Sequence, residues 1–199
     1  MTYLTLHLRA RRVPAAATVA LATSAGAWLA WVLVSDTRQI GAPLAEIALM
    51  LACVAAAVTF SGDDEALDRT AAFAWPRVRA LHLLTVFGLL IALFSVTLIT
   101  PAQFGPFSFM VRDAAGLLGL TALGAVLLGT QRAWFVPVGW SAITVFWGGP
   151  SSNPGMQVLA WMTQPSGATA STITALALAV IGGGAYVHGR AGLPRTENL

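Results

Sequence analysis

Charged residues are scarce in this chain. They make up 10% of its 199 residues, whereas 57% are hydrophobic. A soluble domain carries about a quarter charged residues, so this composition excludes an ordinary soluble domain. The sequence therefore predicts an integral membrane protein, and its long apolar runs predict an all-α one.

Lysine is absent, so all eleven basic side chains are arginines. They lie at the ends of apolar runs, where they set orientation in a membrane, and we expect no binding to nucleic acid. Cys53 is the one cysteine, which excludes an internal disulfide and a paired-cysteine zinc site. It lies inside an apolar run, where a lone cysteine behaves as a small hydrophobic residue.

Sequence signatures of enzymes are also absent. The chain has no His-Glu-x-x-His zinc motif, no Gly-x-Ser-x-Gly nucleophile motif and no phosphate-binding loop. His7, His82 and His188 are far apart and lie near predicted span ends, where anchoring explains them better than a metal site. We therefore expect no catalytic residue, metal or cofactor in this chain. A haem held by two of the histidines is the alternative, although no spacing supports it.

Six apolar runs have about the length that a bilayer core of about 30 Å requires, although the fifth is shorter. They predict a single transmembrane domain over residues 1–199. The predicted spans are about 14–34, 41–60, 78–99, 109–129, 133–147 and 169–187.

The arginines predict the orientation of these spans. Nine of them fall on one side of a six-span arrangement, and only Arg38 and Arg112 fall on the other. Basic residues are enriched in cytoplasmic loops. We therefore expect a multi-pass protein of the plasma membrane with both termini in the cytoplasm.

The long polar segment from Ser61 to His82 interrupts the apolar pattern. Ser61 can cap a helix, acidic residues follow in its first turn, and Pro76 ends the helical pattern. We predict a cytoplasmic surface helix over about 62–74 that docks a partner; a solvated connecting loop is the alternative. The candidate partner-binding residues are Asp63, Asp64, Glu65, Leu67, Asp68 and Arg69.

The outer segment 148–168 has an unusual pattern. Gly, Pro and Ser residues stand at both of its ends, and its apolar middle, 156–162, is too short to span a bilayer. Irregular backbone cannot face lipid, so we expect a re-entrant or interfacial segment that packs on protein or lies at the headgroups. An ordinary outer loop with one exposed apolar turn is the alternative.

Three ionisable residues lie inside predicted spans, where such groups are costly and often functional. Glu46 is flanked only by apolar residues, and it could bind a cation, relay a proton or pair with an arginine. Arg112 and Asp113 are adjacent, and neighbouring helical positions point about 100° apart. We therefore expect them not to pair with each other but to reach other spans, such as Arg112 to Glu46. Structural contacts near the outer interface are the alternative to a transport pathway.

Small residues are dense in two of the predicted spans. Gly119 follows Ala115 by one helical turn, and Gly182, Gly183 and Gly184 form a run. Small faces let transmembrane helices approach closely, so we expect tight packing or dimerisation there.

The order of these elements resembles that of the short permease subunits of ATP-binding-cassette exporters. Those proteins have six spans, a coupling helix between spans two and three, and a partly inserted outer segment before the last span. The resemblance covers the whole chain as architecture, from the 62–74 helix through the tight turn at 130–132 to the 148–168 segment. The chain differs in its short beginning, since only about a dozen residues precede the first span.

The resemblance implies a permease that moves a hydrophobic or amphipathic substrate. A separate ATPase subunit, which binds ATP and Mg, would dock on the 62–74 helix. A second permease copy or relative would lie beside this chain in the membrane lipid, and the substrate would pass between the two permease subunits. Two other functions fit the sequence. One is a membrane scaffold or signalling partner that docks through the acidic helix, and the other is a proton-coupled carrier that uses Glu46.

Overall fold

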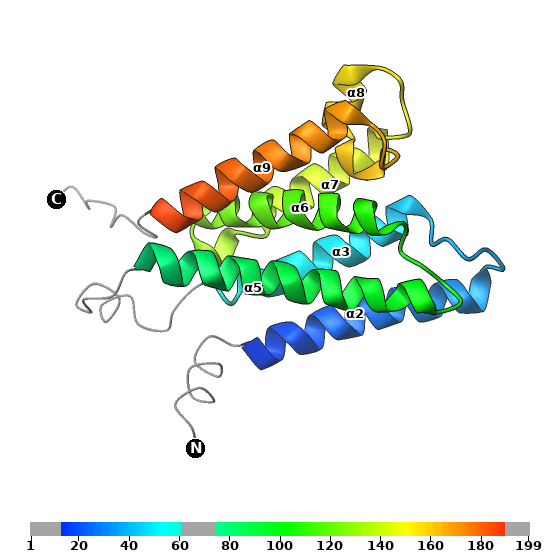
Figure 1. Ribbon diagram of the computed structural model, residues 1–199, viewed down its shortest axis with the longest axis horizontal. Helices are drawn as coiled ribbons and strands as arrows, with labels where there is room; N and C mark the ends of the chain where they lie inside the picture. The colour runs from blue at the N-terminus through cyan, green and yellow to red at the C-terminus, as the bar shows by residue number, and fades with distance from the viewer. Residues whose placement is uncertain (1–12, 61–74, 190–199) are drawn as a thin grey trace.

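The computed structural model describes residues 13–60 and 75–189, and these residues form helices and turns. One isolated bridge joins Gln39 to Gln103, where the connection between residues 34 and 42 meets the connection between residues 99 and 107. The longer helices run along the long axis of the molecule (Figure 1). The α-helices of the described residues are α2 (Val13–Val34), α3 (Ala42–Ala57), α5 (Trp75–Ser95), α6 (Phe107–Leu128), α7 (Phe135–Trp147), the short α8 (Pro154–Leu159) and α9 (Thr169–His188). The 3-10 turns are η1 (Val96–Ile99), η2 (Thr130–Arg132) and η3 (Trp161–Thr163).

Four of the described helical segments are long and apolar enough to cross a membrane: α2, α5 together with η1, α6 and α9. The membrane character predicted from composition therefore has its counterpart in the fold. The other two predicted spans contain shorter helices, since α3 has 16 residues and α7 has 13. At about 1.5 Å per residue, α7 extends only about 20 Å, which is less than the ~30 Å of a bilayer core.

Local sequence explains why α3 and α7 are short. Pro43 stands in the first turn of α3, where proline is tolerated, and the helix gives way to a turn before Ser61. The helix α7 follows the η2 turn and stops at Gly148, which has an extended conformation and precedes Gly149 and Pro150.

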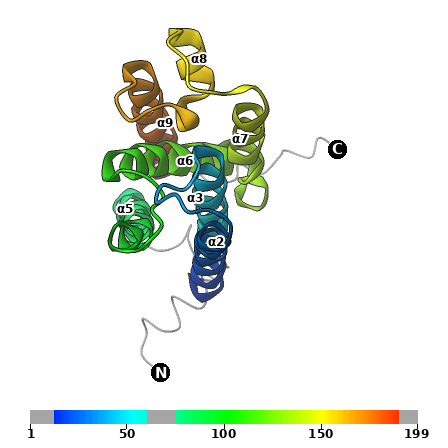
Figure 2. The same cartoon turned by 90° about the vertical axis from the view of Figure 1, so that its right-hand side faces the viewer.

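The helix α6 is the centre of the bundle. In the end-on view, α3, α5, α7 and α9 surround it, and α2 lies outside against α3 (Figure 2). In the most apolar 18-residue stretch of α6, 67% of the residues are buried, whereas in the corresponding stretches of α2 and α5 only 6% and 11% are buried. The leucines and valines that α2 and α5 expose are suited to a lipid environment.

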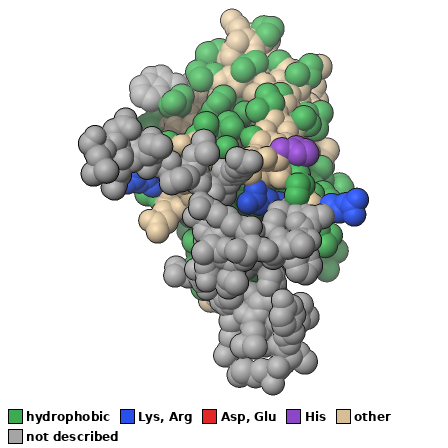
Figure 3. All heavy atoms as spheres, turned by 90° about the vertical axis from the view of Figure 1, so that its left-hand side faces the viewer, with side chains coloured by type: hydrophobic (Ala, Val, Ile, Leu, Met, Phe, Trp, Pro, Cys, Tyr) green, Lys and Arg blue, Asp and Glu red, His purple; other side chains and the backbone are tan. Residues whose placement is uncertain are grey.

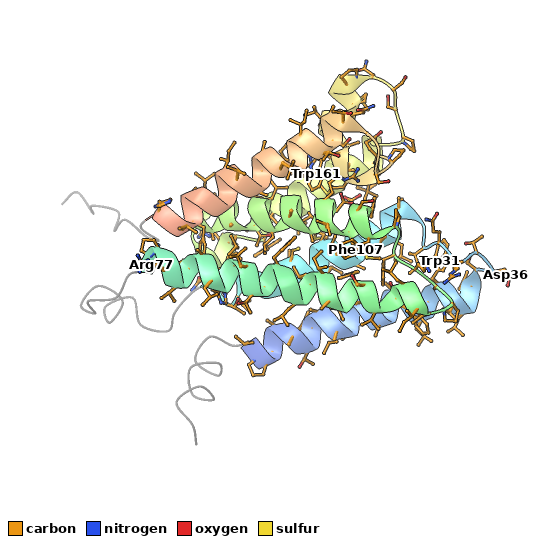
Figure 4. The ribbon with its side chains drawn as sticks, in the orientation of Figure 1. Trp31, Asp36, Arg77, Phe107 and Trp161 are labelled. Carbon is orange, nitrogen blue, oxygen red and sulfur yellow. The ribbon has the colours of Figure 1, made fainter. Side chains whose placement is uncertain are left out.

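The two ends of the bundle differ in chemistry. Arg77 and Arg79 stand in the first two turns of α5, Arg132 ends η2, and His188 ends α9. The view onto this end shows arginine and histidine side chains between hydrophobic ones (Figure 3). Asp36 lies at the opposite end of the molecule (Figure 4).

Close contact between α6 and α9 depends on glycine, as the sequence predicted. A Cβ atom at Gly182 would overlap the backbone carbonyl of Gly119, and a Cβ at Gly119 would overlap the backbone at Leu178. Backbone atoms cannot move aside as a flexible side chain can. The two helices therefore approach at a distance that only glycine permits at these positions.

Replacing Gly182 with alanine should destabilise the bundle, because the added methyl group forces α6 and α9 apart. We expect a loss of about 1–3 kcal/mol, the usual range for overpacking. Gly184→Ala is the matched control, since a Cβ there meets no atom within 4 Å. Thermal unfolding of the two variants in the same detergent checks this, and equal midpoints would contradict the close contact.

Candidate functional site

The three ionisable residues predicted inside the spans are buried and lie near one another. Glu46 stands in the second turn of α3, and Arg112 and Asp113 stand in the second turn of α6. Their exposed fractions are 1%, 6% and 0%. Glu46 is close enough to Asp113 for the two carboxyl groups to repel each other when both are ionised. The fold therefore assembles a charged cluster at the α3–α6 contact, formed by Glu46, Arg112 and Asp113.

Arg112 and Asp113 form an ion pair, which corrects the expectation that these neighbours do not pair. Arg112 Nε donates to Asp113 Oδ1 at 2.7 Å. The long arginine side chain makes this possible, because it bends back along the helix and places its guanidinium 5.1 Å from the ring centroid of Phe109. The expected pairing of Arg112 with Glu46 is also wrong, since the Arg112–Asp113 bridge is the ion pair that this cluster makes.

The remaining edge of the Arg112 guanidinium holds the outer segment. Its two terminal nitrogens donate to the backbone carbonyls of Pro165, at 3.0 Å, and Gln164, at 2.9 Å. Hydrogen bonds from a charged donor are stronger than neutral ones, and the planar guanidinium fixes their directions. One side chain thus links the central helix to the chain between α8 and α9.

Glu46 has no such partner. The Ser141 hydroxyl of α7 lies beside its carboxyl group, but that hydroxyl contacts Met162 Sδ at 3.6 Å. Within the described ranges, neither Glu46 carboxyl oxygen has a hydrogen-bond donor, and the same holds for Asp113 Oδ2. Buried carboxyl oxygens without a donor are rare in proteins and call for a functional explanation.

The outer segment 148–168 packs on protein, as one of its predicted arrangements required. Trp161 and Met162 are fully buried, whereas Val158 and Leu159 on α8 remain partly exposed. The indole of Trp161 lies directly against Gly116 of α6, where any Cβ atom would overlap the ring (Figure 4). Val158 and Leu159 form the exposed apolar turn of the alternative arrangement, whereas the burial of Trp161 and Met162 is that of a segment packed on protein.

Gln164 fixes the shape of the outer segment from within. Its amide nitrogen donates to the carbonyls of Gly149 and Ala160, and its amide oxygen accepts from the Ser151 backbone N–H at 2.9 Å. The side chain is fully buried and joins both ends of the segment. Its backbone carbonyl is also one of the two that Arg112 holds, so the segment and the charged cluster form one unit.

A pocket of about 330 Å³ opens beside this unit. Phe109, which lies under the Arg112 guanidinium, forms part of its wall, and so do Gln164 and Pro165, whose carbonyls Arg112 holds. The other lining residues are Gln39, Ile40, Ala42, Phe104, Gly105, Pro106, Thr163 and Ser166.

The predicted partner-docking residues, Asp63 to Arg69 on the 62–74 helix, lie outside the described residues. Within 13–60 and 75–189, no group of three His, Cys, Asp or Glu side chains could hold a metal ion. Cys53 is buried and free, in agreement with its reading as a small hydrophobic residue.

Sequence reasoning identified the three charged residues but missed their neighbours Ser141, Trp161 and Gln164. Only the last two had any signal in the sequence, since both lie in or beside the apolar middle of the segment that we singled out for its turn residues. Ser141 had none, because a single serine in an apolar helix does not reveal which side chain it faces.

Comparison with known proteins gives no relative, since no protein-family model, curated protein or solved structure matches this chain. The site must therefore be interpreted from its own geometry.

Arg112→Met should strongly destabilise the protein, because it leaves the Asp113 carboxylate buried without its counter-ion and frees the outer segment. Removing one partner of a buried ion pair costs about 3–5 kcal/mol. The double variant Arg112→Met with Asp113→Leu should recover much of this loss, since it removes both charges. Thermal unfolding in detergent measures both effects, with Arg38→Met at the exposed outer loop as control. A double variant as unstable as the single one would contradict the role of the ion pair.

Proposed function

We propose that this chain is the membrane-spanning subunit of an exporter that is driven by a separate ATPase. The observation that carries the proposal is the outer segment 148–168, which folds back onto the central helix and is held there by Arg112. This agrees with the partly inserted segment that the resemblance implies before the last span. The η2 turn between α6 and α7 agrees with the tight second cytoplasmic turn.

In this proposal the chain crosses the plasma membrane six times, with both termini in the cytoplasm. The four long helices cross fully, and α3 and α7 are the two short crossings. The short α7 is continued by the outer segment, whose buried residues fill the depth that the helix does not reach. The arginine-rich end of the bundle faces the cytoplasm, in accord with the positive-inside rule (Figure 3).

The proposed mechanism is conformational. ATP and Mg bind to the partner ATPase, which docks on the 62–74 helix through Asp63, Asp64, Glu65, Leu67, Asp68 and Arg69. Closure of the ATPase moves that helix and shifts the bundle between two access states. The exposed apolar faces of α2 and α5 leave room for a second permease subunit, and a hydrophobic or amphipathic substrate would pass at that interface.

Reversing the charge of Asp64, Glu65 and Asp68 together should abolish docking of the ATPase, because it inverts the charge of the proposed contact surface. The measurement is recovery of an ATP-binding-cassette ATPase with the tagged chain from host membranes in mild detergent. Asp36→Arg, at the opposite end of the bundle, is the control and should retain the partner. Capture of a different partner by the wild-type chain would favour the scaffold function, and undiminished ATPase recovery with the triple variant would refute docking on this helix.

A proton-coupled carrier is the second candidate function, and the Glu46 carboxyl favours it. An ionisable group that is buried in a membrane bundle without a hydrogen-bond donor is a candidate for a proton relay. Such a carrier would work without an ATPase and would follow the proton gradient.

The two driving forces can be separated in host cells. The compounds released by cells with the wild-type chain are compared with those released when the partner ATPase is inactivated and when a protonophore is added. We expect export to stop without the ATPase and to survive the protonophore for as long as ATP is maintained. Export that persists without the ATPase, and that is lost with the protonophore and with Glu46→Gln, would establish the carrier instead.

A further inference from the structure

The charged cluster contains an unbalanced charge. It has two carboxyl groups, Glu46 and Asp113, and one guanidinium, Arg112. With both carboxyls ionised, the cluster has a net charge of −1 in a region that is closed to water. An uncompensated charge is costly to bury, and one bound proton makes the cluster neutral.

In the part of the chain that the structure describes, no other Asp, Glu or Arg side chain is buried beside the cluster. Asp36 and Arg38, in the connection between α2 and α3, are exposed. The helices α2 and α7 and the turn η3, which pack against α3, contain no Asp, Glu, His, Lys or Arg in their sequences. The ionisable groups of α5 and α9 lie at the other end of the bundle, where His82 lies 2.9 Å from Thr59 just after the end of α3. Cys53 is on α3 itself, two turns beyond Glu46. The net charge of the site is therefore set by Glu46, Arg112 and Asp113 alone among the described residues.

Hydrogen bonding places the proton. Asp113 accepts from Arg112 Nε and is held as the partner of that cation. Glu46 contacts no cation in the described ranges, and neither of its oxygens has a hydrogen-bond partner there. The neutral Ser141 hydroxyl beside it stabilises a negative charge less than the Arg112 guanidinium stabilises that of Asp113. A protonated Glu46 also has an O–H to donate, and the Asp113 Oδ2 atom nearby lacks a donor.

A metal ion is a poorer ligand for this site than a proton. Hard cations such as Mg²⁺ and Ca²⁺ require six or more oxygen ligands. Around Glu46 the polar groups are the Asp113 carboxyl and the Ser141 hydroxyl, and Met162 adds a thioether. No metal-binding group of three ionisable side chains occurs in the described part of the chain.

We infer that Glu46 binds one proton and that this proton controls the hold of Arg112 on the outer segment. When Glu46 is protonated, the cluster is neutral, Asp113 anchors the guanidinium, and Arg112 holds the carbonyls of Gln164 and Pro165. When the proton leaves, the new negative charge repels Asp113, the partner that orients Arg112. The guanidinium then turns toward the two carboxylates and releases the outer segment beside the pocket.

This arrangement is a proton-operated latch at the outer face. It rests on the proposed function only in giving the latch a role in transport, because it concerns contacts inside the described bundle. In an exporter, release of the segment would widen the pocket of about 330 Å³, because the latched residues form part of its wall. In a carrier, the same proton would be the coupling ion.

The bound proton can be observed directly. Infrared spectra of the purified full chain in nanodiscs should contain the carbonyl band of a buried, protonated carboxylic acid. The band should disappear in Glu46→Gln, which is nearly isosteric and keeps the neutral form. Absence of the band from the wild-type chain, or its persistence in the folded Glu46→Gln variant, would overturn the assignment.

The latch is tested by the accessibility of the outer segment. In a Cys53→Ser background, Thr163→Cys reports the buried end of the segment and Val158→Cys reports its exposed helix. The ratio of their maleimide labelling rates cancels the pH dependence of the thiol chemistry. We expect this ratio to rise severalfold between about pH 5 and about pH 9, the range in which buried carboxyls titrate.

Two variants complete the test. With Glu46→Gln the ratio should stay low at every pH, and with Glu46→Asp, which keeps a carboxyl group, it should still rise. A wild-type ratio that does not change with pH, or a rise that survives Glu46→Gln or requires sodium, would refute the latch. Neither measurement uses an ATPase or a substrate, so failure of the proposed transport function would leave these outcomes unchanged.

Discussion

The guanidinium of Arg112 is the constraint on which segment 148–168 and its contacts with the bundle depend. A cation in the interior of an apolar bundle must have its charge balanced and its N–H groups bonded by protein groups, because apolar surroundings do neither. Asp113 supplies the charge, and the carbonyls of Gln164 and Pro165 accept the remaining donors. Those carbonyls belong to an irregular stretch that also needs donors. Each part therefore solves the hydrogen-bonding problem of the other, and the outer segment stays inside the bundle.

Different parts of the central helix α6 present different kinds of residue to these contacts. Its outer end has the charged pair, its middle has Gly116, which leaves room for Trp161, and Gly119 on the next turn meets Gly182 of α9. In a membrane, burial of apolar surface does little to bring helices together, so close backbone contact and polar bonds decide the arrangement. The helices that lack such features, α2 and α5, expose most of their apolar surface.

Glu46 differs from Arg112 because its buried carboxyl oxygens have no hydrogen-bond partner among the described residues. A group of this kind weakens the fold unless it is neutral, and a proton is the smallest change that makes it so. Asp113 is repelled by an ionised Glu46 and attracted by Arg112. A change of charge at Glu46 therefore reaches the outer segment through two intermediate side chains, Asp113 and Arg112. The polar groups that are costly inside the bundle are thus connected to segment 148–168 through hydrogen bonds and charge.

The sequence by itself determined the membrane character, the helical class and the identity of the three buried ionisable residues, because composition and hydrophobic length depend only on the order of residues. It also indicated that Gly119 and Gly182 lie at helix contacts and that segment 148–168 is not a plain loop. It could not determine which buried polar side chains contact each other. The Arg112–Asp113 bridge, the isolation of Glu46 and the roles of Ser141, Trp161 and Gln164 depend on side-chain reach and on contacts between helices far apart in the chain. A helical repeat predicts where a side chain starts, but only tertiary packing decides where a long one ends.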